Sequence, residues 1–226
     1  MRILILGGIN ITPENLYRLK EDLREENHYA EIVLWSELDR KLVKKHKYSY
    51  LEYFADRLLD ILSNVSYDYI ITETIASNIL LRVLNNIDEY INVILISPSY
   101  YKTMRGKLRF LSFLRVFYTY SLLYFKAHLS HKYKSRELLS PMVASCLYTE
   151  AYNDSYMIVS FSTNHIHLIR GRDDTIISNR NLKLLAESIV ITDEYVIDGG
   201  YDLLRTRYKD TYASILYILS HTWDNY

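Results

Sequence analysis

The sequence predicts an α/β protein with a doubly wound, mainly parallel sheet of about six strands and a helical cap insertion. Short apolar runs that stop at Gly, Pro or Ser alternate with longer segments whose apolar residues recur at helical spacing. One interval of 66 residues, 99–164, interrupts this rhythm, and it far exceeds an ordinary crossover of about a dozen residues. Because no repeat or linker divides the chain, we expect residues 1–226 to form a single domain, with 99–164 as its cap or lid.

The first half of the chain alternates strands with helices. Arg2–Leu6 is a continuous apolar run that ends at Gly7 and Gly8, as is typical of a fully buried central strand. Thr12-Pro13-Glu14 supplies an N-cap, a first-turn proline and an early acid, which together predict a helix to about Asn27. The further elements expected here are a strand at Glu31–Trp35, a helix at Tyr50–Ser63, a strand at Tyr67–Ile71, a helix at Ile75–Leu84 and a strand at Asn92–Ile96.

The second half begins its regular pattern with an apolar strand at His165–Ile169, which leads into the turn Gly171-Arg172-Asp173-Asp174. A strand that ends in this way presents carboxylates at the carboxyl edge of an open sheet, where such folds place their sites. The last expected strand is Glu194–Ile197, and the expected helices are about Asn181–Glu187 and Tyr208–His221.

Composition sets modest bounds on function. The 226 residues carry 27 basic and 27 acidic side chains, so the net charge gives no general argument for nucleic-acid binding. The single Cys146 excludes an intrachain disulfide and fits a reducing compartment. Met1 and Arg2 run directly into apolar residues without a secretory leader, which favours a cytoplasmic protein. Glutamine is absent, as in a protein depleted of thermolabile residues, which suggests a thermophile or a virus or plasmid of one.

The interval 99–164 has a lopsided charge. Nine Lys and Arg residues precede its first acid, Glu137, and Phe110–Phe125 contains seven aromatic rings with Arg115 as its one charge. This run is too short to span a membrane, which takes about 20 apolar residues. Two interpretations remain open: a cap helix buried against the sheet or in a homodimer, or an interfacial helix through which residues 99–136 contact an anionic surface or membrane.

The strand order, the long insertion and the acid-bearing turn resemble the α/β-hydrolase family over essentially the whole chain, with the family's first two strands missing. The resemblance places Thr72-Glu73-Thr74-Ile75-Ala76 on the family's Gly-x-Ser-x-Gly elbow, with Thr74 at the nucleophile position. It places Asp174 at the position of the catalytic acid and Tyr201 at the position of the histidine. Gly7 and Gly8 fall on the loop that supplies an oxyanion-hole amide.

Two of the three triad positions therefore carry a different residue. The elbow requires φ above zero, which a β-branched threonine tolerates poorly, and Thr72 is bulky where the family has glycine. Tyrosine, with an ordinary pKa near 10, is a poor general base near neutrality. The sequence thus indicates a degenerate triad in a non-catalytic protein that binds a ligand or partner. The alternative is an active esterase- or lipase-like hydrolase that uses Thr74 or a nearby serine, Ser77 or Ser99.

Simpler explanations compete for the same residues. Asp174 can cap the following segment or pair with an arginine, and Tyr201 can lie in a turn beside a solvated acid. His165 and His167 alternate on a strand without a third ligand nearby, so we expect no metal. The turn at Gly7 lacks Gly-x-Gly-x-x-Gly spacing, so we expect no nucleotide cofactor either.

Overall fold

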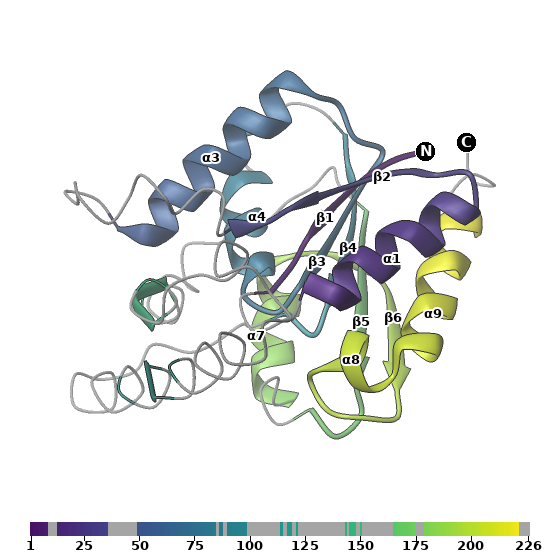
Figure 1. Cartoon of the computed structure of the whole chain (residues 1–226). Coiled ribbons are helices and arrows are strands. Elements are labelled where there is room, and N and C mark those ends of the chain that lie inside the picture. The colour runs from purple at the N-terminus through teal and green to yellow at the C-terminus, as the bar shows by residue number, and fades with distance from the viewer. Residues whose placement is uncertain are drawn as a thin grey trace.

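The computed structural model describes residues 1–8, 13–35, 49–84, 86–87, 90–98, 165–174 and 179–221, together with positions 114, 117–118, 121, 143, 145–147 and 150. Its centre is a sheet of six strands, all parallel, in the order β2-β1-β3-β4-β5-β6 (Figure 1). The strands are β1 (Arg2–Leu6), β2 (Tyr29–Val33), β3 (Tyr69–Glu73), β4 (Asn92–Ile96), β5 (Ile166–Gly171) and β6 (Ile191–Ile197). The predicted fold class is confirmed.

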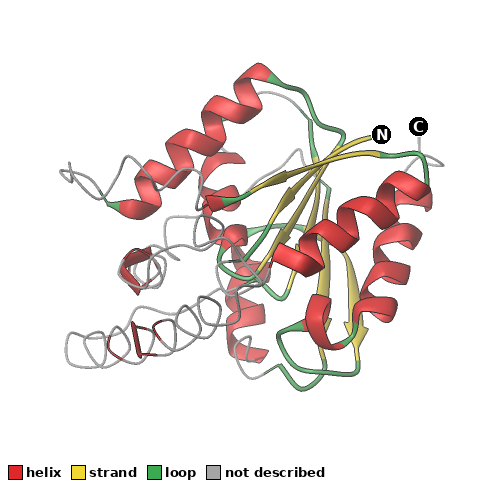
Figure 2. Cartoon of the chain, in the orientation of Figure 1, coloured by secondary structure: helices red, strands yellow, loops and turns green. Residues whose placement is uncertain are grey.

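Helices cover both faces of this sheet, as a doubly wound fold requires (Figure 2). They are α1 (Pro13–Glu25), α3 (Tyr50–Asn64), α4 (Ala76–Leu84), α7 (Asn179–Ser188), α8 (Leu203–Thr206) and α9 (Tyr208–His221). Helices α3, α4 and α7 contribute to the buried cluster on one face, and α1, α8 and α9 contribute to the cluster on the other.

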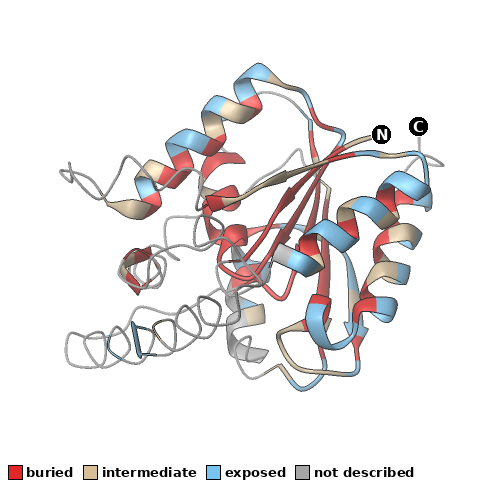
Figure 3. Ribbon diagram, in the orientation of Figure 1, coloured by how far each residue is buried: buried red, intermediate tan, exposed pale blue. Residues whose placement is uncertain are grey.

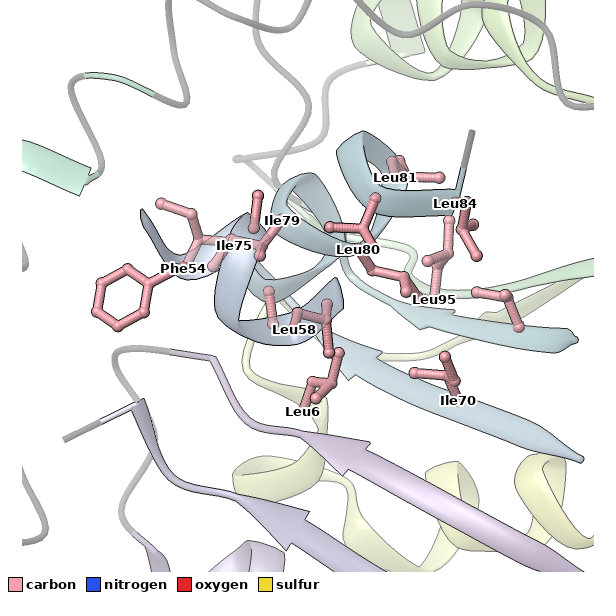
Figure 4. Packing of buried hydrophobic residues seen from close by; sticks show 14 of the residues in the cluster. Leu6, Phe54, Leu58, Ile70, Ile75, Ile79, Leu80, Leu81, Leu84 and Leu95 are labelled. Carbon is pink, nitrogen blue, oxygen red and sulfur yellow. The ribbon is translucent and has the colours of Figure 1, made fainter. Parts of the chain in front are cut away.

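The alternation of side chains along each strand divides the core into these two clusters. Leu4 and Leu6 of β1 face the first cluster, whereas Ile3 and Ile5 face the second. The inner strands are buried along almost their whole length (Figure 3), which explains why they are continuous apolar runs in the sequence. Figure 4 shows the first cluster, where strand residues such as Ile70 meet α3 and α4.

Several strand boundaries differ from the expected ones. β3 extends to Glu73, two residues beyond the expected end, because Thr72 and Glu73 continue the ladder with Leu95 and Ile96 despite their polar side chains. β2 begins at Tyr29 rather than Glu31, since Tyr29 is paired with Arg2. β6 begins at Ile191 rather than Glu194, and its largely exposed edge position explains why its sequence lacks an apolar run.

Most of the interval 99–164 lies outside the described residues, so its role as a cap stays a prediction. Its described positions are all helical. Val143 and Leu147 are buried in the cluster formed with α3 and α4, and a Glu150 carboxylate oxygen accepts a hydrogen bond of 2.7 Å from the Leu51 amide in the first turn of α3. This end of the interval is therefore anchored to the sheet domain.

The aromatic run of the interval is described at a few positions. Leu114, Phe117 and Tyr118 are exposed, whereas the basic residues on either side, like the Thr12 N-cap, lie outside the described residues. In the part of the chain that the structure describes, no helix combines the length and the apolar character needed to cross a bilayer.

Candidate active site at the carboxyl edge of the sheet

Thr74 lies in a strained turn between β3 and α4. Its φ of 50° is in the left-handed region, which β-branched residues rarely adopt. Its amide donates to the Ile96 carbonyl at 3.0 Å, and its carbonyl accepts from the Ser77 amide at 3.1 Å. These bonds fix the turn between two buried elements, so the fold holds Thr74 in the conformation expected of an elbow nucleophile despite the cost to threonine.

The residues two before and two after Thr74 lie where the strand and the helix meet. Thr72 and Ala76 are both 0 % exposed. The Thr72 and Ser77 hydroxyl oxygens lie 2.8 Å apart in a buried hydrogen bond. Threonine is accommodated at position 72 because its hydroxyl has this partner, while the small Ala76 leaves room on the helix side.

The acid-bearing turn after β5 packs backbone to backbone against the chain that follows β6. The Arg172 amide donates to the Ile197 carbonyl at 2.7 Å, and the Asp173 amide donates to the Gly199 carbonyl at 2.9 Å. A Cβ atom at Gly171 would lie only 2.2 Å from the Gly200 carbonyl oxygen. Glycine is thus required at position 171, and the turn that carries Asp174 is fixed against the segment that carries Tyr201.

Thr74, Asp174 and Tyr201 follow the carboxyl ends of β3, β5 and β6, so all three lie at the same edge of the parallel sheet. Asp174 and Tyr201 are both partly buried. Convergence of the three side chains on one point stays a prediction.

Glu73 is a feature of this edge that the sequence analysis did not identify. Its side chain is 1 % exposed, and neither carboxyl oxygen has a hydrogen-bond partner among the described residues. Burial raises the pKa of Glu73 well above its usual range, and the negative charge of Asp202 raises it further. The Leu204 amide lowers this pKa in part, although it lies outside normal hydrogen-bond geometry. An acid at the end of an apolar strand was the signal that could have revealed it.

The histidines that the structure describes lie away from this edge. His28 precedes β2, His165 precedes β5, and His167 is the second residue of β5. His221 ends α9, which returns toward the amino edge after β6. His128 and His131 lie outside the described residues. Within the described part of the chain, Thr74 therefore has no imidazole beside it to act as a base.

Gly7 and Gly8 follow β1 and are buried at the same edge. The Gly7 carbonyl accepts a hydrogen bond of 2.6 Å from the Trp35 indole, which holds this loop against the chain that follows β2. Residues 9–12, which continue the loop, lie outside the described residues. Among the described residues, no group of three or more His, Cys, Asp or Glu side chains is placed to hold a metal ion.

Comparison with solved structures identifies the fold. The chain superimposes on a hydrolase from Oleispira antarctica with a TM-score of 0.74 and 14 % identity, covering 97 % of this chain and 91 % of that one. An esterase from Exiguobacterium antarcticum gives a TM-score of 0.72 at 11 % identity, with 97 % and 92 % of the two chains covered. A thermophilic esterase from Thermogutta terrifontis gives 0.67 at 13 % identity, with 97 % and 89 % covered.

Sequence comparison adds no closer relative: no family model matches the chain, and no curated protein matches it. The structural neighbours show that the chain has the α/β-hydrolase fold, as the resemblance in the sequence predicted.

Proposed function

We propose that this chain is a non-catalytic protein of the α/β-hydrolase fold that binds a ligand or partner at the carboxyl edge of its sheet. The observation that carries this proposal is the environment of the Thr74 hydroxyl. It is buried on the elbow and has no hydrogen-bond partner among the described residues. A serine-type nucleophile needs an adjacent base to become reactive.

The residue at the histidine position supports the same conclusion. Tyr201 offers a phenol, which can donate a hydrogen bond but cannot shuttle a proton as imidazole does. The described histidines lie toward the other edge of the sheet. The turn at Asp174 then serves to hold the two loops together, which the bonds from Arg172 and Asp173 support.

The alternative is an active esterase- or lipase-like hydrolase with Thr74 as its nucleophile. The strained backbone at Thr74 favours this alternative, because strain of about 1–3 kcal/mol is retained mainly at functional sites. The same strain is also compatible with a ligand-binding role, in which the turn presents the hydroxyl to a bound molecule.

The cellular location is a separate part of the proposal. The single free thiol of Cys146 supports a reducing, cytoplasmic compartment.

Incubation with short-chain nitrophenyl esters and a fluorophosphonate probe tests the proposal. We expect neither turnover nor labelling of the wild-type chain. Labelling that disappears in Thr74→Ala but survives in Ser77→Ala would establish the hydrolase alternative. Labelling that depends on Ser77 or Ser99 would place the nucleophile elsewhere.

A positive control comes from restoring the missing groups. The double variant Thr74→Ser, Tyr201→His should become labelled, whereas Thr74→Ala, Tyr201→His should not. If the folded double variant stays unlabelled, the assignment of position 201 to the histidine position fails.

A further inference from the structure

A second buried hydroxyl lies next to Thr74 at the end of β4. Ser97 is 0 % exposed, and its Oγ has no hydrogen-bond partner among the described residues. Its φ of 42° is left-handed, like that of Thr74. A buried polar group without a partner costs about 1–3 kcal/mol, and a left-handed backbone adds to that cost. Two such residues on adjacent strand ends call for a functional explanation.

The strand register places Ser97 at the centre of the candidate site. Glu73 is paired with Ile96, so the next residues, Thr74 and Ser97, lie side by side at a strand spacing of about 5 Å. The Thr74 amide donates to the Ile96 carbonyl, and the Ser97 amide donates to the Ile169 carbonyl of β5 at 2.8 Å. Ser97 therefore lies between the elbow on β3 and the turn after β5 that leads to Asp174.

We infer that Ser97 and Thr74 together bind a polar group of an uncharged, hydroxyl-bearing ligand; this inference rests on the proposed ligand-binding function. A hydroxyl group both donates and accepts hydrogen bonds, so an alcohol or diol can satisfy two neighbouring hydroxyl side chains at once. The bound group supplies the hydrogen-bond partners that the Ser97 and Thr74 hydroxyls do not have among the described residues.

The charges around the pair oppose a charged ligand. Two arginines of this edge are engaged with acids: Arg172 Nε lies 3.0 Å from an Asp198 carboxylate oxygen, and Arg205 pairs with Asp202. The acids Asp173 and Asp174 on the turn after β5 disfavour an anion. The first turn of α4 follows Thr74 directly, and its positive dipole end favours an oxygen acceptor over an ammonium group.

Three probes of equal chain length test the inference: 1,2-hexanediol, hexanoate and hexylammonium. Binding is measured by saturation-transfer NMR and by titration of the backbone amide signals of the full chain. We expect the diol to bind most tightly and to shift the amide signals of Thr74 and Ser97. Loss of one hydrogen bond should weaken diol binding about three- to tenfold in Ser97→Ala.

Two further variants control for folding. Ser97→Gly removes the same hydroxyl but suits the left-handed backbone, so it should lose affinity as Ser97→Ala does while remaining folded. Thr211→Ala removes a buried hydroxyl in the first turn of α9 that already has a partner, the Arg207 carbonyl, and it should keep diol affinity within about twofold.

Each remaining outcome overturns the inference. If both Ser97 variants bind the diol as tightly as the wild type, the ligand lies elsewhere and the inference fails. The proposed ligand-binding function would still stand if Thr74→Val abolished diol binding. Tighter binding of hexanoate or hexylammonium would refute an uncharged ligand. Binding of none of the probes would refute the inference, whereas hydrolysis of nitrophenyl esters that depends on Thr74 would refute the proposed function.

Discussion

Single residues at the carboxyl edge show how tightly the loops of this site are built. Gly171 ends β5 where a side chain would meet two backbone carbonyls, the Gly200 oxygen at 2.2 Å and the Gly199 oxygen at 2.3 Å. Backbone atoms cannot turn aside as a flexible side chain can, so the contact tolerates no Cβ. Gly200, on the other side of the same contact, has open space where its own Cβ would lie.

We therefore predict that Gly171→Ala destabilises the protein by about 2–3 kcal/mol, as expected for overpacking against a fixed backbone. Gly200→Ala is the matched control and should change the free energy of unfolding by less than about 1 kcal/mol. Urea denaturation followed by circular dichroism measures both. Equal effects of the two substitutions would contradict the backbone contact between the turn at Asp174 and the segment before Tyr201.

The residue scale also marks the limit of sequence-based prediction. Motif spacing identified Thr74 because an elbow has a fixed length between a strand and a helix. It did not identify Ser97, which looks like an ordinary residue at the end of a strand. It also did not identify Glu73, which is an isolated acid in the sequence. What distinguishes them is that their side-chain oxygens are buried without a hydrogen-bond partner among the described residues, a setting created by neighbouring strands far apart in the sequence.

At the scale of elements, the inner strands could be predicted and the edge strands less well. β1 and β4 have the expected bounds because burial on both faces demands apolar side chains at nearly every position. β6 has exposed residues along most of its length, so its sequence contains Thr192, Asp193 and Glu194, and only its last half looked like a strand.

The pair of strands β5 and β6 also contains a titratable contact. His167 on β5 is 4 % exposed, and its Nδ1 lies 3.2 Å from a carboxylate oxygen of Asp193 on β6. The Nε2 atom is buried and has no hydrogen-bond partner among the described residues. Burial lowers the pKa of His167, and the half-exposed Asp193 opposes this shift without reversing it.

We predict from this shift that acid weakens the packing of β5 against β6. Because the folded pKa lies below the ordinary value of 6.5, the unfolded chain binds a proton first as the pH falls. The contribution of His167 is therefore constant above that value and is lost as the pH falls below it toward the folded pKa. In His167→Gln, thermal unfolding should depend less on pH over this window than in the wild-type chain. His221→Gln, at the exposed end of α9, is the control, and an unchanged pH dependence in His167→Gln would contradict the prediction.

At the scale of the whole molecule, the division into one parallel sheet and two helical layers followed from the alternation of elements in the sequence. The long interval 99–164 is the part that this reasoning could not place, because its aromatic and basic residues are compatible with both a buried cap and a surface contact. Val143 and Leu147 near its end join the buried cluster that includes α3 and α4, and Glu150 accepts a hydrogen bond from Leu51, 99 positions away in α3. Such long-range partners leave no periodic signal in the local sequence.

Global stability should also depend on Glu73, the buried acid beneath the segment that follows Tyr201. Burial and the charge of Asp202 hold its folded pKa well above the ordinary value of 4.5. Below that value both the folded and the unfolded chain keep the proton, and the stabilising contribution of neutral Glu73 is fully present. Above it the unfolded chain releases the proton first, so the wild-type chain loses about 1.4 kcal/mol per pH unit until the folded pKa is reached.

Glu73→Gln keeps the shape of a neutral carboxyl group without an ionisable proton, so it should unfold at higher urea concentration than the wild type at pH 7. The difference between the two should shrink as the pH approaches 4.5, because the wild-type side chain is then neutral in both states. Asp210→Asn, an exposed substitution in the first turn of α9, controls for the general effect of removing an acid. If the difference in free energy of unfolding between Glu73→Gln and the wild type stays constant across this pH range, Glu73 is charged in the folded protein. A positive charge near this buried side chain would then have to compensate it.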